Sequence, residues 1–246
     1  MAQRRILRLS GADTVEFLQG LITNDVAKLT KGLVYAALLT PQGKYIADFF
    51  LAADGDDVLL DVDDSLADTL VQRLSLYKLR ADVTIALAGL NLQRGTGPAP
   101  DGALPDPRHP DLGWRAYSPA PEAQDDTDWT ALRVAHLIPE SGIELGPESY
   151  ILEAGFEALN GVDFRKGCYV GQEVTARMKH KTELRKGLAR VAIDGTAEPG
   201  SDITANGKAV GQLHSVSGQQ GIAYLRFDRA GQNLQADGAS LTLLPR

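Results

Sequence analysis

The 246-residue sequence contains a single cysteine, Cys168. One thiol cannot form an internal disulfide, and a chain so poor in thiols suits a reducing compartment better than a secreted, disulfide-stapled scaffold. The N-terminal residues are charged and include no apolar run of signal-peptide length. No stretch approaches the roughly 18 apolar residues of a membrane span. These absences predict a cytoplasmic protein without a membrane partner.

Histidine is also scarce, and its distribution argues against a metal site. The four histidines lie far apart in the sequence, none with the spacing of a zinc ligand pair: His109, His136, His180 and His214. A cysteine-protease arrangement would need a histidine and an orienting amide or carboxylate beside Cys168. His180 is available, but nothing else in the sequence indicates that it has this role. No phosphate-binding loop or dinucleotide-binding glycine motif is present. The sequence therefore predicts neither a metal centre nor a common nucleotide site.

The net charge of −7 argues against general nucleic-acid binding, and no DNA binding is expected. The charge is nevertheless uneven. Residues 165–190 hold eight Lys or Arg against two Glu, so this window carries +6 while the remainder carries −13. Such a local patch on an acidic body would attract a small polyanion or the acidic face of a partner protein. The alternative is a solvated basic hairpin whose charges serve solubility.

The residues before position 94 alternate in a way typical of an αβ unit. Amphipathic spacing predicts a helix over residues 13–22, capped by Asp13 or Thr14. Three runs rich in β-formers within residues 33–63 predict an antiparallel meander. A second helix follows over residues 64–80 with Ser65 as its N-cap, and a further strand over residues 81–89.

The rest of the chain changes character twice. Residues 95–128 hold seven of the twelve prolines and predict a long irregular connection, ending in a strand near "GWRAYS". Helices are expected at residues 127–137 and 147–161. Short strands with glycine turns then predict a small β-barrel, with Asn206-Gly207 as a hairpin turn. We therefore divide the chain into three parts, at residues 1–94, 95–186 and 187–246.

The cysteine lies in a short glycine-flanked segment that favours reactivity. Gly167 and Gly171 permit close approach of a ligand or another chain segment. A helix starting at Gln172 would place Cys168 just ahead of its N-terminus, where the helix dipole together with nearby Lys and Arg would lower the thiol pKa. The alternative is an inert, buried cysteine.

The segment "KGCYVGQEVTAR", Lys166 to Arg177, matches the signature K-G-C-[FY]-x-G-Q-E-x-x-[AS]-R. In this it resembles the YgfZ-type folate-binding proteins, which include mitochondrial iron–sulfur assembly factors and are related to the aminomethyltransferase (T-protein) of the glycine cleavage system. The segments "FLQGLITNDV", "LTPQGKYIADFFL", "DPRHPDLGWR" and "AVGQLHSVSGQQGIAYLRFD" look similar to the same family in the expected order. The resemblance covers nearly the whole chain.

The resemblance implies an α+β fold, a three-part ring of two interlocked αβ subdomains and a C-terminal β-barrel that receives a reduced folate. It implies an accessory protein for maturation or repair of [4Fe–4S] proteins. Its cofactor would be tetrahydrofolate or a one-carbon derivative, and its partners iron–sulfur client or assembly proteins. Cys168 would be the reactive group. Because a cluster normally takes several thiolates, any cluster here would be transient and shared. The residues expected to bind the cofactor or to support its site are Asn24, Asp25, Asp48, Arg133, Glu153, Lys166, Gln172, Glu173 and Arg177.

One departure from the family pattern bears on catalysis. T-protein relatives carry paired aspartates where this chain has Ala47-Asp48, so the acid that assists methylene transfer lacks its neighbour. A conventional enzyme is therefore not expected, and a folate-dependent one-carbon transferase is the alternative. A scaffold with a vestigial folate site is a third hypothesis.

Several candidate residues also have ordinary structural interpretations. Asn24 and Asp25 would equally suit an Asx turn, and Glu173 a first-turn helix carboxylate. Arg133 would suit a packing ion pair as well as a carboxylate ligand of the cofactor.

Overall fold

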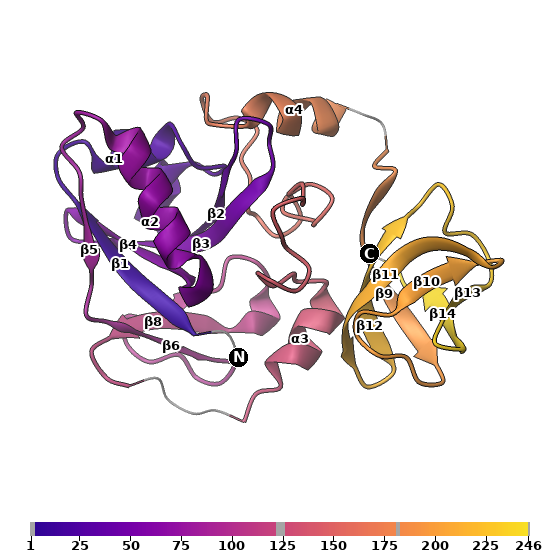
Figure 1. Ribbon diagram of the computed structural model, residues 1–246. Coiled ribbons are helices and arrows are strands. Elements are labelled where there is room, and N and C mark those ends of the chain that lie inside the picture. Colours follow the sequence, from indigo (N-terminus) through magenta and orange to yellow (C-terminus); the bar gives the residue numbers. More distant parts are fainter. Residues whose placement is uncertain (1–2, 122–125, 181–182, 246) are drawn as a thin grey trace. The chain divides into compact units, whose positions relative to one another are not determined.

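The computed structural model describes residues 3–121, 126–180 and 183–245 (Figure 1). Its internal contacts group the chain into two compact units. The first unit comprises Met1–Thr127 and Phe156–Ala176, and the second Asp128–Gly155 and Arg177–Arg246. The three-part division at residues 94 and 186 stays a prediction. Lys181, part of the basic window, lies outside the described residues.

A five-stranded antiparallel sheet forms the centre of the first unit. Its strand order is β2-β3-β4-β1-β5. The strands are β1 (Arg4–Ser10), β2 (Val34–Leu39), β3 (Tyr45–Asp54), β4 (Asp57–Asp63) and β5 (Thr84–Leu87). The predicted meander is confirmed by β2, β3 and β4, which pair in sequence order. Because side chains alternate along each strand, the sheet presents two different faces.

Two helices cover the first face of this sheet: α1 (Thr14–Gln19) and α2 (Asp64–Lys78). Leu70 and Leu74 of α2 are fully buried there, as their helical spacing predicts. The N-cap of α2 is Asp63, whose carboxylate accepts a hydrogen bond from Ser65 N at 2.9 Å, so the expected Ser65 cap is wrong. Asp63, the last residue of β4, already supplies the acceptor that the first turn of α2 needs. The helix therefore begins at Asp64, one residue before Ser65.

The proline-rich segment is more ordered than predicted and covers the second face. It includes a three-stranded sheet of order β6-β8-β7, with β6 (Asn91–Gly95), β7 (Leu104–Pro105) and β8 (Trp114–Ser118). The strand expected near "GWRAYS" is confirmed as β8. Leu104 and Tyr117 from this segment pack against Ile6 and Ala52 of the main sheet. A short 3₁₀ turn, η2 (Pro110–Leu112), joins β7 to β8.

A buried ionic network lies between the second face and this covering segment. Asp61 accepts hydrogen bonds from Arg4 Nε and Arg115 Nη2, each at 2.6 Å. The Arg115 guanidinium lies 3.9 Å above the Phe50 ring. Arg108, paired with Asp106 at 2.8 Å, lies over the same ring at 4.7 Å. Stacked and paired guanidiniums of this kind fix the covering segment onto the sheet.

The second unit contains a helix and a closed six-stranded barrel. Helix α3 (Trp129–His136) begins after Asp128, whose side chain accepts from Ala131 N at 2.9 Å. The barrel order is β10-β11-β12-β9-β14-β13. Its strands are β9 (Lys186–Asp194), β10 (Asp202–Ala205), β11 (Lys208–Ser217), β12 (Gln220–Arg226), β13 (Leu234–Ala236) and β14 (Ala239–Leu243). Asn206 and Gly207 both have positive φ in the β10–β11 hairpin, which confirms the predicted turn.

The helix predicted over residues 147–161 is wrong. Residues 151–160 form successive turns, and Gly155 has a φ of 81°, which no α-helix accommodates. The Glu153 carbonyl accepts from Leu188 N at 2.8 Å, and this bond to the barrel replaces a helical one. Long-range pairing therefore overrides the local helical pattern here.

Candidate functional site

The motif loop, residues 161–171 of the first unit, exposes its cysteine. Cys168 is a free thiol with an exposed side chain, which contradicts the alternative of a buried, inert cysteine. Gly171 has a φ of 83°, and a Cβ there would lie 2.6 Å from the Thr40 carbonyl oxygen. A neighbouring chain segment therefore requires that glycine. At Gly167 a Cβ would meet nothing within 4 Å.

Helix α4 (Gln172–His180) follows the motif loop directly, as the sequence predicts. Glu173 lies exposed in its first turn, the position of a helix N-terminal carboxylate. Gln172 is half-buried, and its backbone N–H donates to the Tyr169 carbonyl at 3.2 Å. Arg177 lies in the last turn and is exposed.

Lys166 is buried, unlike the thiol two residues later in the sequence. Its Nζ donates to the carbonyl oxygens of Gln19 at 2.8 Å, Ile22 at 2.6 Å and Asn24 at 2.9 Å. Burial lowers the pKa of the Lys166 ammonium to about 8. This ammonium is thus engaged with backbone oxygens of the segment that follows α1.

Asn24 and Asp25 fix that same segment. The Asn24 Nδ2 donates to the carbonyls of Tyr35 at 2.7 Å and Asn160 at 2.6 Å. Its Oδ1 accepts from Asp25 N at 2.9 Å. Asp25 caps the 3₁₀ helix η1 (Val26–Lys31) by accepting from Ala27 N at 3.0 Å. Asp25 therefore has the contact of an Asx turn, whereas the Asn24 side chain joins this segment to distant backbone carbonyls.

Asp48 lies on the second face of the main sheet, and two tyrosines hold its carboxylate. The hydroxyl of Tyr45 donates at 2.6 Å and that of Tyr35 at 2.9 Å. Burial, and then the charge of Asp48, raise the pKa of Tyr35 well above its ordinary value. The Tyr35 ring stacks on Phe156 at a centroid distance of 5.1 Å. Asp48 is therefore a positioned acceptor within an aromatic wall.

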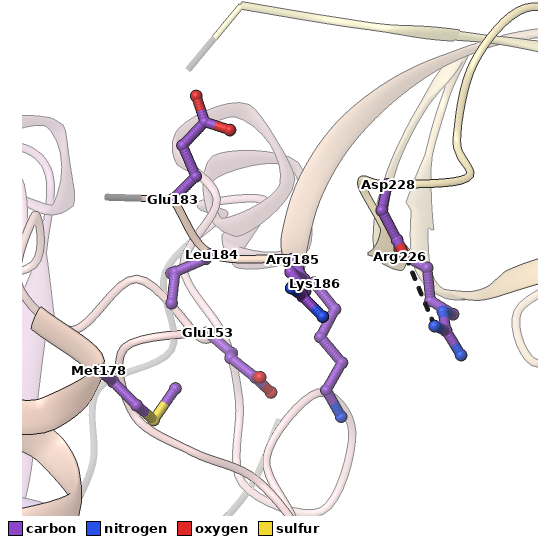
Figure 2. Close-up of a pocket in the computed structure, with 8 residues that line it drawn as sticks. All are labelled: Glu153, Met178, Glu183, Leu184, Arg185, Lys186, Arg226 and Asp228. Carbon is purple, nitrogen blue, oxygen red and sulfur yellow. Dashed lines mark ion pairs between the residues drawn. The ribbon is translucent and has the colours of Figure 1, made fainter. Parts of the chain in front are cut away.

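A pocket of about 770 Å³ lies in the second unit (Figure 2). Its lining comes from the turns that begin at residue 151, the end of α4, the entry to β9 and the end of β12. It comprises Glu153, Met178, Glu183, Leu184, Arg185, Lys186, Arg226 and Asp228. The lining thus combines a methionine and a leucine with three cations and three carboxylates. Arg226 pairs with Asp228 at 3.6 Å.

Glu153, predicted from the sequence, is the buried carboxylate of this pocket. Its Oε2 accepts from the Tyr224 hydroxyl at 2.7 Å, and Lys186 Nζ lies 5.7 Å from the centroid of the same tyrosine ring. Burial, and then this hydrogen bond, raise the pKa of Tyr224. Sequence reasoning missed Tyr224 and Arg226, because a barrel strand gives no local signal that its side chains line a pocket. Lys186, in contrast, belongs to the cluster of basic residues within 165–190 that the sequence predicts to attract a polyanion.

Arg133 has the contacts of a packing ion pair. Its Nε lies 2.8 Å from Glu140 and its Nη1 3.1 Å from Glu144. Nη2 donates to Ser215 Oγ at 3.1 Å, and Nη1 also to the Ile138 carbonyl at 3.0 Å. These bonds join α3 to the following loop and to β11 within the second unit.

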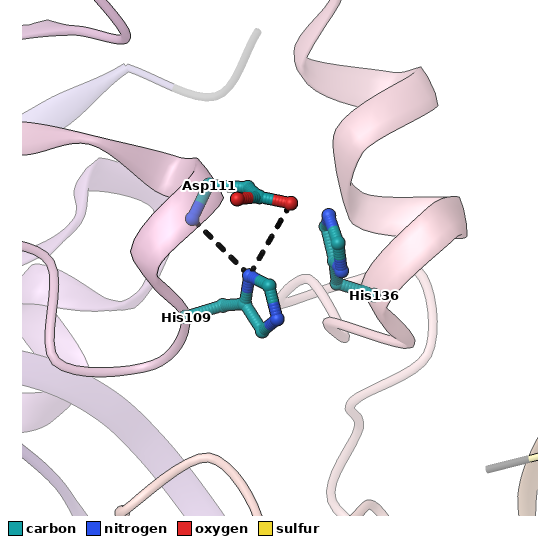
Figure 3. Close-up of side chains that lie close together, drawn as sticks. All are labelled: His109, Asp111 and His136. Carbon is teal, nitrogen blue, oxygen red and sulfur yellow. Dashed lines mark hydrogen bonds and ion pairs between the residues drawn. The ribbon is translucent and has the colours of Figure 1, made fainter.

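His109 and Asp111 form a local cap in the first unit. His109 Nδ1 accepts from Asp111 N at 3.2 Å and lies 3.9 Å from Asp111 Oδ2 (Figure 3). This bond caps η2 at its N-terminus. His136, also labelled in Figure 3, ends α3 in the second unit. The expectation that the chain holds no metal centre stays a prediction.

The sequence is similar to proteins that are named as iron–sulfur cluster assembly factors. Residues 185–246 match the family model described as CAF17, C-terminal beta-barrel domain. The mouse (Mus musculus) protein named iron-sulfur cluster assembly factor IBA57, mitochondrial, is 31% identical over 272 residues, covering 92% of this chain and 76% of its own length. The human (Homo sapiens) protein of that name is 30% identical over 289 residues, covering 98% and 81%. The chain spans only 54% of the 32%-identical homologue from Pyricularia oryzae.

Among solved structures, the glycine cleavage system aminomethyltransferase T from Bartonella henselae superposes with a TM-score of 0.71. The match covers 98% of this chain and 83% of that one at 12% sequence identity, which establishes the fold alone. Within the described ranges no helix is long and apolar enough to cross a membrane. The chain belongs to the IBA57/CAF17/YgfZ family, with an α+β aminomethyltransferase T-like fold that ends in a six-stranded β-barrel.

Proposed function

We propose that this protein is a tetrahydrofolate-binding accessory factor for the maturation or repair of [4Fe–4S] proteins, acting through Cys168. Family membership supports the iron–sulfur role, because the mouse and human relatives are named as iron–sulfur cluster assembly factors. Its partners would be iron–sulfur client or assembly proteins. Those relatives are mitochondrial by name, whereas we propose a cytoplasmic location for this chain.

The pocket of the second unit is the observation that best supports folate binding. A pterin offers adjacent N–H donors along one edge, and the buried Glu153 carboxylate is a matching acceptor, oriented by Tyr224 at 2.7 Å. The glutamate tail of a folate carries carboxylates, which Arg185, Lys186 and Arg226 of the same lining would bind. A volume of about 770 Å³ suits a ligand of this size.

The exposure of Cys168 supports a role in transfer or redox contact with a partner. A buried thiol would be inert, whereas this one is exposed in front of α4. A single thiol leaves most ligand positions of a cluster unfilled. We therefore propose that any cluster bound here is transient and shared with a client or assembly protein.

The contacts of Asp48 favour this accessory role over the one-carbon transferase. Tyr35 and Tyr45 both donate to its carboxylate, and its neighbour is Ala47 instead of a second acid. Both carboxylate oxygens of Asp48 are therefore already engaged by donors of the protein, which leaves them less accessible to a substrate. The transferase remains the second hypothesis, and turnover in a folate-dependent methylene-transfer assay would reverse the order.

The test is Cys168→Ala, expressed in cells that lack the native protein. We expect the variant to fold normally, because the thiol is exposed, and to abolish the gain in activity of a [4Fe–4S] client enzyme. Arg165→Ala, an exposed change in the same loop, is the matched control and should restore the client. Full client activity with Cys168→Ala would contradict the proposed role of the thiol.

A further inference from the structure

The surroundings of Lys166 have the composition of a monovalent-cation site. Each N–H donor of its ammonium has a backbone carbonyl acceptor, at 2.8 Å, 2.6 Å and 2.9 Å. The Tyr169 ring completes the site, with its centroid 5.1 Å from Nζ. Carbonyl oxygens with an aromatic face are the groups that hold a desolvated cation. The ammonium therefore acts as an internal cation tethered to the motif loop.

The three carbonyls come from one segment. Gln19 ends α1, and Ile22 and Asn24 lie in the segment between α1 and η1, where Ile22 forms an isolated bridge with Leu38. The last carbonyls of a helix lack intrahelical partners, so the Gln19 carbonyl needs a donor from elsewhere. The charged side chains that act on Lys166 are Asp25 and Asp163, which favour its charged form, and Lys28, which opposes it.

Other contacts hold the two ends of the motif loop. At its start, Thr23 Oγ1 donates to the Gly161 carbonyl at 2.7 Å, and Asp163 N donates to the Thr23 carbonyl at 3.0 Å. At its end, Gly171 packs against the Thr40 carbonyl. Lys166 provides the anchor in the middle, two residues before the exposed thiol.

We propose that Lys166 is the positioning residue of Cys168: its ammonium binds the carbonyls of Gln19, Ile22 and Asn24 and thereby fixes the loop that presents the thiol. The same ammonium joins this loop to Asn24 and Asp25, so a ligand that displaces that segment would also displace the cysteine. This inference rests on the proposed function only where it assumes that Cys168 reacts with a partner protein. The contacts of Lys166 with the three carbonyls are made in the protein alone, without ligand or partner.

The single cysteine allows a direct test by electron paramagnetic resonance of a nitroxide attached to Cys168. In Lys166→Ala the label should rotate about twofold faster or more, because the middle of the loop loses its anchor. Adding about 100 mM ammonium chloride should restore the slower motion, since free ammonium fits the vacated carbonyls. Tetramethylammonium chloride at the same concentration should not, because it has the charge but no N–H donor. Arg165→Ala is the matched control and should leave the label unchanged.

Equal label mobility in wild type and Lys166→Ala, or equal effects of the two salts, would overturn the proposal. The wild-type protein gives an independent check if the variant fails to fold. Nitrogen-15 NMR of labelled lysines should then show one ammonium whose protons exchange slowly at neutral pH. A spectrum in which every ammonium exchanges rapidly would also overturn it. Neither measurement uses folate or a client enzyme, so failure of the proposed function would leave the result standing.

Discussion

The ionic network behind the main sheet makes a quantitative prediction about Asp61→Asn. Asp61 is fully buried, and its carboxylate accepts from Arg4 and Arg115 at 2.6 Å and from Tyr117 at 3.1 Å. An asparagine of the same shape keeps one acceptor oxygen but removes the charge. It also turns an NH₂ group toward a guanidinium. Arg115 then remains buried with only the more distant carboxylate of Asp106, whose Oδ2 lies 3.4 Å from Arg115 Nη1.

The expected cost is about 3 to 5 kcal/mol, the usual penalty for breaking a buried ion pair at one partner. For a unit of this size that corresponds to a melting temperature roughly 10 °C lower. The same carboxylate gives a pH signature. Burial alone would raise its pKa, but the charges of Arg4 and Arg115 lower it to about 2.

In the unfolded chain the pKa of Asp61 is about 3.9, which is higher than its folded value of about 2. The ionised carboxylate therefore contributes its full stabilisation above about pH 4. As the pH falls from about 4 through 2, wild type should lose about 2 kcal/mol that Asp61→Asn does not lose. The stability difference between the two proteins should therefore narrow in that range.

Urea unfolding monitored by tryptophan fluorescence measures both effects. The chain has two tryptophans, Trp114 in the first unit and Trp129 in the second, so a Trp129→Phe background isolates the first unit. Asp106→Asn, which removes a carboxylate of the same network paired mainly with Arg108, provides a graded comparison. A cost below about 1 kcal/mol for Asp61→Asn, or a stability difference that stays constant from pH 4 to 2, would show that the charge of Asp61 does not stabilise the network.

Two further predictions concern the candidate sites. In Gly187→Ala the new Cβ would lie 2.6 Å from the Glu153 carbonyl oxygen, so the Glu153 backbone must shift and tetrahydrofolate affinity measured by calorimetry should fall. Gly231→Ala, where a Cβ meets nothing within 4 Å, should leave affinity unchanged; equal affinities for all three proteins would contradict the placement of the pocket. Asn24→Ala removes a donor from the buried Tyr35 carbonyl and from the part-buried Asn160 carbonyl, and should lower the free energy of unfolding by about 1 to 3 kcal/mol in urea titrations. A loss under about 0.5 kcal/mol would show that water satisfies them.

The parts of the fold that follow from local pattern could be predicted from the sequence. The runs within residues 33–63 alternate or are continuously apolar, and they became β2, β3 and β4. The Asn206-Gly207 pair is the strongest short hairpin signal, and it joins β10 to β11. Helix α4 begins at Gln172, where the glycine-flanked loop ends. In each case neighbouring residues carry the information.

The parts that depend on distant residues could not be predicted. Glu153 was expected on a helix, but its carbonyl bonds to Leu188, more than thirty residues later in the sequence. Lys166 was expected to bind the cofactor or support its site, yet its acceptors are backbone carbonyls at the end of α1 and in the segment after it. The resemblance implied Asp48 but not the two tyrosine hydroxyls that hold it. Such contacts arise from tertiary packing, which single-sequence periodicity does not encode.

The proposed function depends on tetrahydrofolate binding by the second unit at Glu153. Anaerobic calorimetric titration of mono- and polyglutamyl tetrahydrofolate into wild type, Glu153→Gln and Lys186→Ala tests it most directly. We predict that Glu153→Gln weakens both ligands about 10- to 100-fold, because one hydrogen bond to a charged acceptor becomes a clash of donors. Lys186→Ala should weaken the polyglutamyl form more than the monoglutamyl form, and Lys208→Ala, an exposed barrel lysine, should weaken neither. Absence of binding to wild type, or equal affinity in all four proteins, would show that tetrahydrofolate does not bind at Glu153.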